Sequence, residues 1–147
     1  MSNPNRAKGT AAESLVRDYL LSRGITATRA PQHGSADRGD VWAFPTDVGH
    51  RLVIEVKAGE QAANPTMTQV RAWQREANVE AARVPDADIA CLVLKRKGSA
   101  KPADWPAWVT VGDVESWHNP RLKSSRWAYQ WVCLPFGELI DHLVVES

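Results

Sequence analysis

Cysteine and long apolar runs are scarce in this chain of 147 residues. Its two cysteines, Cys91 and Cys133, are too few for a disulfide framework and lack the spacing of metal ligands, so we expect both to be reduced. No apolar run approaches the roughly 18–20 residues that a membrane span needs, and the first residues, MSNPNRAKGTAAE, contain no apolar core of a secretory signal. These absences predict a cytoplasmic protein that has no disulfides and does not enter a membrane.

Net charge is also small, at +1, and by itself it does not favour nucleic-acid binding. The charges are unevenly distributed: residues 1–101 hold 15 basic and 11 acidic residues (+4), whereas residues 102–147 hold 3 and 6 (−3). The basic segment ends in a cluster formed by Lys95, Arg96, Lys97 and Lys101. This cluster fits two interpretations, a solvated loop or an edge that contacts phosphates.

Tryptophan, by contrast, is abundant, and five of the seven tryptophans follow residue 101. The length fits a single domain, 1–147, which we divide into a core over 1–101 and a Trp-rich C-terminal extension over 102–147. Aromatic side chains in such an extension can stack on unpaired bases. The packing of a small subdomain, or a dimer interface, is the more common use.

Apolar periodicity predicts helices over 10–23, 66–83 and 136–144, and strands over 25–30, 40–44, 51–57, 88–94 and 108–111. Thr10 and Glu13 have the spacing of a capping box, so we expect the first helix to begin there. The second and third strands are close enough to form a hairpin. The order α-β-β-β-α-β, followed by a tail that is ambiguous over 112–134, predicts an α/β domain with a mixed central sheet flanked by helices.

The strand RLVIEVK, residues 51–57, has two charged residues where a buried strand is expected. Since side chains alternate along a strand, Leu52, Ile54 and Val56 share one face. Glu55 and Lys57 share the other. An unpaired charge near a core is costly, so the presence of Glu55 and Lys57 on a buried strand needs an explanation. A Glu-x-Lys pair alone is usually an ordinary ion pair.

Other acidic residues make the pattern more specific. Asp40 opens the preceding strand, and carboxylates on neighbouring strands can lie about 5 Å apart, which suits a shared divalent cation. Glu13 is in line with Val16 and Leu20 on the first helix, so it leans towards the buried side. A helix cap or a surface role is the ordinary alternative for Glu13.

This set resembles the PD-(D/E)XK nuclease superfamily, with GDV (39–41) and IEVK (54–57) in the motif positions and Gly39 in place of the usual proline. Within the superfamily it is most similar to the Holliday-junction resolvases of archaeal type and their relatives in actinobacterial phages. The residues that carry this similarity are AKGTAAE (7–13), HGSADRGDVWA (33–43), VIEVKAG (53–59) and LKRKG (94–98). The resemblance covers roughly residues 6–101 and implies a restriction-endonuclease-like core.

The resemblance implies a Mg²⁺-dependent endonuclease, in which Mn²⁺ can substitute. Asp40, Glu55 and the backbone carbonyl of Val56 would bind the metal, Glu13 would complete the shell, and Lys57 would orient the attacking water or stabilise the transition state. Ser35 falls near a serine that similar resolvases use at the active site, although a turn serine is an equal alternative.

The implied substrate is branched DNA, in particular a four-way junction. The expected DNA contacts are Arg6 and Lys8 before the first helix, Arg29 and Arg38 beside the loop 31–39, and Lys95, Arg96 and Lys97. Because a junction offers two equivalent strands, we expect a homodimer with paired active sites. Two alternatives remain: another nuclease of the superfamily (restriction, repair or replication-associated), or a catalytically inactive DNA-binding module.

Overall fold

The computed structural model describes residues 4–31, 39–44, 51–85, 87–118 and 129–144. The helices are α1 (Pro4–Ser22), α2 (Glu60–Ala63), α3 (Met67–Ala82), the 3₁₀ turn η1 (Pro102–Asp104), α4 (Val111–His118) and α5 (Phe136–Leu143). The strands are β1 (Thr26–Arg29), β2 (Val41–Phe44), β3 (Arg51–Lys57), β4 (Ala87–Leu94), β5 (Pro106–Thr110) and β6 (Trp131–Pro135).

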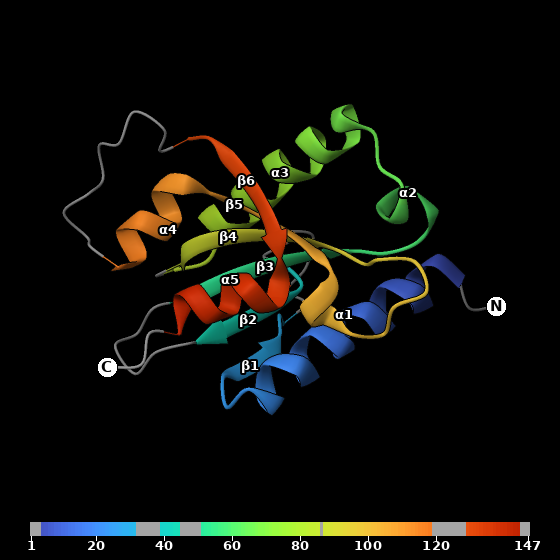
Figure 1. The fold of residues 1–147 in the computed structure, drawn as a ribbon, viewed down its shortest axis with the longest axis horizontal. Coiled ribbons are helices and arrows are strands. Elements are labelled where there is room, and N and C mark those ends of the chain that lie inside the picture. The colour runs from blue at the N-terminus through green and yellow to red at the C-terminus, as the bar shows by residue number, and fades with distance from the viewer. Residues whose placement is uncertain (1–3, 32–38, 45–50, 86, 119–128, 145–147) are drawn as a thin grey trace.

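The strands form one sheet in the order β1-β2-β3-β4-β5-β6. β3 and β4 are parallel and are joined through α2 and α3, while all other neighbours are antiparallel. The α/β class, the mixed sheet and the antiparallel pairing of β2 with β3 are therefore confirmed. In Figure 1 the sheet separates α3 at the top from α1 and α5 below it.

The alternation along β3 directs its side chains into two different layers. Leu52, Ile54 and Val56 are buried in the larger core together with apolar residues of α1 and α5. On the opposite face Val53 packs with Ala81 of α3. Glu55 and Lys57 consequently point towards α3, on the face that the sequence predicted for them.

The first helix begins at Pro4, so the prediction that it begins at Thr10 was wrong. Gly9 suggested a break, but a glycine inside a helix costs only about 1 kcal/mol relative to alanine. Pro4 also suits a first helical turn, where no N–H donor is needed. Lys8, expected in a segment before the helix, therefore lies within it.

The described part of the tail beyond residue 101 joins the same sheet through β5 and β6. The ambiguous stretch 112–134 contains most of α4 and the start of β6, the outermost strand on this side. Trp105 and Trp117 are buried in the larger core, and the indole Nε1 of Trp117 donates to the Leu143 carbonyl (3.0 Å). Within the described ranges no helix combines the length and the apolarity that crossing a membrane requires.

Candidate functional site

Asp40 lies immediately before β2, and its backbone N–H and carbonyl are both hydrogen-bonded to other segments of the backbone. Its N–H donates to the Ile54 carbonyl (2.9 Å), and its own carbonyl accepts from the N–H of Ala30 (2.8 Å). Because β2 pairs with β3 in the register Val41↔Ile54, Asp40 comes opposite Glu55. The sheet backbone thus positions both carboxylates that the motif predicted.

Gly39, the residue before Asp40, requires a conformation that proline cannot adopt. Its φ is +87°, and a Cβ atom at this position would lie 2.6 Å from Cγ1 of Val53. A proline ring holds φ near −65°. The departure from the usual proline therefore has a structural reason in this chain.

Four charged side chains meet between the start of β2, the end of β3 and α3. The N–H of Val56 donates to Oδ2 of Asp40 (2.8 Å). The ammonium of Lys57 lies 3.2 Å from Oε1 of Glu55 and 3.1 Å from Oε1 of Glu76, which α3 supplies. Glu55 is only 4% exposed, whereas the side chains of Lys57 and Glu76 are 23% and 42% exposed, so the cluster extends from the core to the surface.

Burial and mutual repulsion disfavour the negative charges of this cluster. Burial, followed by the charge of Glu55 and then that of Glu13, raises the pKa of Asp40. Burial, followed by the proximity of Glu80, raises the pKa of Glu55 to about 9. Burial lowers the pKa of Lys57, but Glu55 and Glu76 outweigh it, so that pKa is raised overall. Lys57 is therefore a cation held among carboxylates.

The donor set fits a divalent cation with oxygen ligands. Among the described residues, the buried Oε2 of Glu55 has no hydrogen-bond partner. Since the N–H and C=O of one strand residue point to the same side, the Val56 carbonyl is directed to the side of Asp40. Carboxylate and carbonyl oxygens are the ligands that Mg²⁺ prefers. An added cation would also relieve the repulsion that raises the carboxyl pKa values.

Glu13 lies near this cluster but is engaged elsewhere. Its Oε2 accepts from the guanidinium of Arg29 at 2.8 Å, so Arg29 is bound to an expected site residue. The carboxylates whose oxygens all lie within 4.8 Å of one another, among the described side chains, are those of Glu55, Glu76 and Glu80. Neither Glu13 nor Asp40, both expected metal ligands, is a member of that group.

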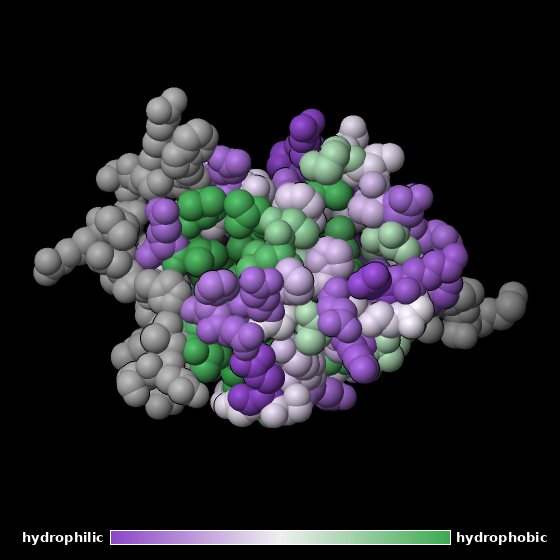
Figure 2. Space-filling model, in the orientation of Figure 1, coloured by the Kyte–Doolittle hydropathy of each residue, from purple (hydrophilic) through white to green (hydrophobic). Residues whose placement is uncertain are grey.

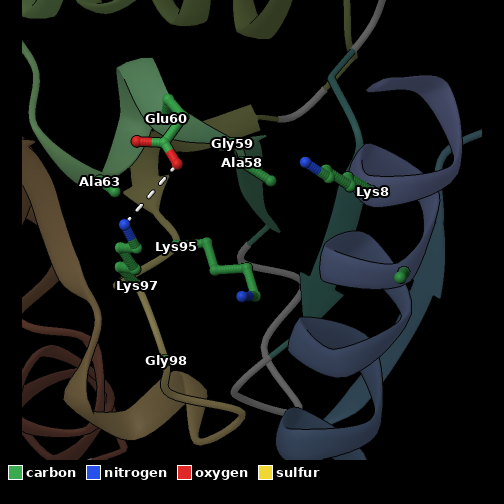
Figure 3. Close-up of a pocket in the computed structure, with 9 residues that line it drawn as sticks. Lys8, Ala58, Gly59, Glu60, Ala63, Lys95, Lys97 and Gly98 are labelled. Carbon is green, nitrogen blue, oxygen red and sulfur yellow. Dashed lines mark ion pairs between the residues drawn. The ribbon is translucent and has the colours of Figure 1, made fainter. Parts of the chain in front are cut away.

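The structure places three of the expected DNA-contacting lysines around one pocket of about 340 Å³. Lys8 reaches it from α1, while Lys95 and Lys97 reach it from the segment after β4 (Figure 3). Arg96 is exposed and does not line the pocket. Arg6 belongs to α1, but its side chain lies outside the described part of the molecule, as do Ser35 and Arg38 in the loop 32–38.

Glu76 and Glu80 were not identified from the sequence, although a signal was present. The buried stripe of α3 includes Trp73, Ala77 and Ala81. Glu80 follows Ala77 by three residues and is itself 3% exposed. A carboxylate within an apolar stripe was the argument that selected Glu13, and the same argument applied to this helix selects Glu80.

No protein-family model matches this chain, and no curated protein matches its sequence. The resemblance to PD-(D/E)XK nucleases consequently depends on the motif residues themselves and on where the fold places them.

Proposed function

We propose that this chain is a Mg²⁺-dependent endonuclease that hydrolyses DNA phosphodiester bonds on a restriction-endonuclease-like core. The observation that carries the proposal is the convergence of Asp40, Glu55 and Lys57 at adjacent strand ends. There, the carboxylates are buried, and the charge of Glu55 is close enough to raise the pKa of Asp40. Oε2 of Glu55 has no hydrogen-bond partner among the described residues. A buried carboxylate oxygen without a partner calls for an explanation, and a bound ion is one that fits this donor set.

Each residue of the cluster has a defined task in this proposal. Asp40, Glu55 and the Val56 carbonyl hold the metal ion, which when bound lowers the pKa of a water ligand and neutralises charge on the phosphate. Lys57, kept protonated by Glu55 and Glu76, orients the nucleophilic water and stabilises the negative charge that develops on phosphate oxygens. Glu13 contributes negative charge from the edge of the site.

The proposed substrate is branched DNA, and the four-way junction is the form that the proposal favours. This finer assignment is supported by the similarity of residues 6–101 to junction resolvases and by the lysine-lined pocket at the same end of β3 as the carboxylates. The test is incubation with labelled four-way junction, flap and linear duplex, each with Mg²⁺ or with EDTA. Junction cleavage that requires Mg²⁺ supports the assignment, and cleavage of linear duplex alone indicates another nuclease of the superfamily.

We also propose a homodimer that docks along β6. This strand lies at the edge of the sheet, and its five residues include no charge. Figure 2 shows hydrophobic residues gathered where α4 and β6 lie in Figure 1, whereas the surface over α5 is largely hydrophilic. Val114, Val132 and Leu134 are only partly buried. An uncharged edge strand is a template for pairing with a second copy.

A two-fold antiparallel β6 pair centred on Cys133 brings the two exposed cysteines opposite each other. Their Cβ atoms would then lie about 5 Å apart. Mild oxidation should therefore yield a covalent dimer that Cys133→Ser does not form. Light scattering should give the dimer mass for both proteins without oxidant. A monomer at the concentrations used for cleavage would contradict this interface.

One observation favours a second candidate, an inactive DNA-binding module. Lys57 is held by two carboxylates at 3.2 and 3.1 Å, as in an ion network that serves only to maintain the fold. In that case the protein binds junctions but cleaves no DNA with Mg²⁺ or Mn²⁺, and Lys57→Ala impairs folding.

A further inference from the structure

The lysine pocket is built from three segments that are distant in the sequence. α1 contributes Lys8 and Ala11, the turn between β3 and α2 contributes Ala58 and Gly59, and the segment after β4 contributes the rest of the basic side chains. In Figure 3 Lys8 and Lys95 extend towards each other across the opening, with Lys97 on the far side beside Glu60. The pocket is therefore a tertiary feature and not a property of the basic cluster at 95–97 alone.

The charge of this lining favours an anion. Its charged members are Lys8, Lys95, Lys97 and Glu60, a net charge of +2. Lys97 and Glu60 are 3.7 Å apart and are both strongly exposed, so this ion pair is weak and exchanges readily with a ligand. The remaining lining residues are alanines and glycines, which leave room for a bulky anionic group.

The segment that carries two of the lysines is held in place. The N–H of Lys95 donates to the Lys57 carbonyl (2.8 Å), and the ammonium of Lys95 lies 5.9 Å from the ring centroid of the buried Trp105. The Trp105 indole in turn donates to the Ser99 carbonyl (3.2 Å). Lys95 is therefore placed at the pocket by contacts on both sides, which lowers the entropy lost when a ligand binds.

The pocket begins where the proposed catalytic strand ends. Ala58 follows Lys57 directly and is three positions after Glu55, so in extended chain their Cα atoms are about 10 Å apart. We propose that Lys8, Lys95 and Lys97 together hold one phosphate of a nucleic-acid strand whose neighbouring phosphate is the one cleaved. This inference rests on the proposed nuclease function and adds the position at which the strand is held.

The test uses the salt dependence of junction binding, measured by fluorescence anisotropy without divalent metal. Each phosphate neutralised by a protein contributes about 0.9 to the slope of log K against log salt. If the three lysines hold a single phosphate, the triple variant Lys8→Ala, Lys95→Ala, Lys97→Ala should lose about 0.9 in slope. Three independent contacts would instead remove about 2.7. A loss near 2.7, or no loss, overturns the inference.

Lys101 supplies the matched control, because it is an exposed lysine close in sequence that does not line the pocket. Lys101→Ala should leave the slope unchanged. Lysine acetylation followed by mass spectrometry provides a second readout on the unmodified chain. Junction DNA should protect Lys8, Lys95 and Lys97 from acetylation while Lys101 reacts as before.

A parallel acetylation experiment with inorganic phosphate distinguishes a pocket that binds free phosphate from one that binds a phosphate of a DNA strand. Protection by both DNA and phosphate supports the proposal that the pocket lysines hold a phosphate of the strand. If that protection is found and no DNA is cleaved, only the catalytic proposal fails. Protection by phosphate without protection by DNA overturns the assignment to a strand. Normal cleavage combined with unprotected pocket lysines overturns the inference and leaves the catalytic proposal intact.

Discussion

The two faces of β3 differ in composition although they belong to the same seven residues. On the side of α1 and α5, Leu52, Ile54 and Val56 enter a continuous apolar core. On the side of α3, Val53 is followed by Glu55 and Lys57, which meet further carboxylates. The first face is what a stable sheet requires. The second face carries the charged side chains of the proposed site.

This difference shows where the protein departs from the most stable arrangement. Buried apolar area contributes roughly 25 cal/mol per Å², whereas buried ion pairs commonly contribute little or destabilise relative to apolar replacements. The raised pKa values of Asp40 and Glu55 show that their charges are unfavourable in the protein without a cation. Substitutions on the apolar face should therefore reduce stability, whereas substitutions on the charged face should reduce activity and leave stability nearly unchanged.

The largest expected effect is the loss of cleavage in Glu55→Gln and in Asp40→Asn. Each change removes one anionic oxygen ligand and almost no volume, so metal binding should fail while the fold persists. Junction binding should be equal or tighter, because each change removes a group that can carry negative charge facing phosphate. Cleavage assays with Mg²⁺ and circular dichroism measure both properties. Wild-type activity in either variant would exclude the assigned site.

Lys57→Ala should reduce the cleavage rate by several orders of magnitude and leave metal affinity nearly unchanged. A protonated lysine donates hydrogen bonds and is not a metal ligand. Single-turnover cleavage and Mn²⁺ titration of the same protein separate the two quantities. If Lys57→Ala fails to fold, Lys57→Met replaces it, because methionine keeps an unbranched apolar side chain for packing. A folded but inactive Lys57→Met protein would still support a catalytic role for the ammonium.

On the apolar face, Ile54→Ala should lower the free energy of unfolding by about 2–5 kcal/mol, the usual cost of a cavity in a core. Ile54 is fully buried beside Glu55 in the sequence, so the pair Ile54→Ala and Glu55→Gln compares the two faces at one place. Urea denaturation should show a large loss for the first and none for the second. A comparable loss in both would remove the distinction between the faces.

The stability of the metal-free protein should fall as the pH rises from about 5 to 8. Unfolded carboxyl groups ionise near pH 4. In the folded state Asp40 and Glu55 retain protons at higher pH because their pKa values are raised, so the folded state binds more protons than the unfolded state. Thermal unfolding in EDTA should show this slope, and Asp40→Asn should reduce it. Mg²⁺ should stabilise more strongly at higher pH, since it binds the ionised carboxylates.

The smallest expected effect is that of Glu76→Gln, a reduction in cleavage rate of about 10- to 100-fold with binding retained. Glu76 holds the Lys57 ammonium at 3.1 Å without being part of the motif. Glu76→Asp keeps the charge and should recover part of the rate. Arg75→Ala, at an exposed position of the same helix, is the control and should behave as wild type.

Much of the architecture could be predicted from local patterns, and the failures have physical causes. The strands β1 to β4 and the helices α3 and α5 follow from periodicity and turn residues. β6, with the sequence WVCLP, and α4, with VGDVESWH, are too short for periodicity to distinguish. β6 becomes a strand through pairing with β5. α4 is held by the burial of Trp117 and by a hydrogen bond from the N–H of Asp113 to Oγ1 of Thr110 (3.2 Å).

The candidate site, like the fold, has one part that the sequence predicted and another that it did not. By itself the sequence determined that Asp40, Glu55 and Lys57 meet, because a hairpin register and a period of two are local properties of the chain. Only the tertiary structure placed Glu76 and Glu80 of α3 against them and brought Lys8 to Lys95, since these contacts depend on how helices dock on the sheet. Such docking is set by the packing of whole faces, and no spacing within one segment encodes which charged side chains will face each other across it.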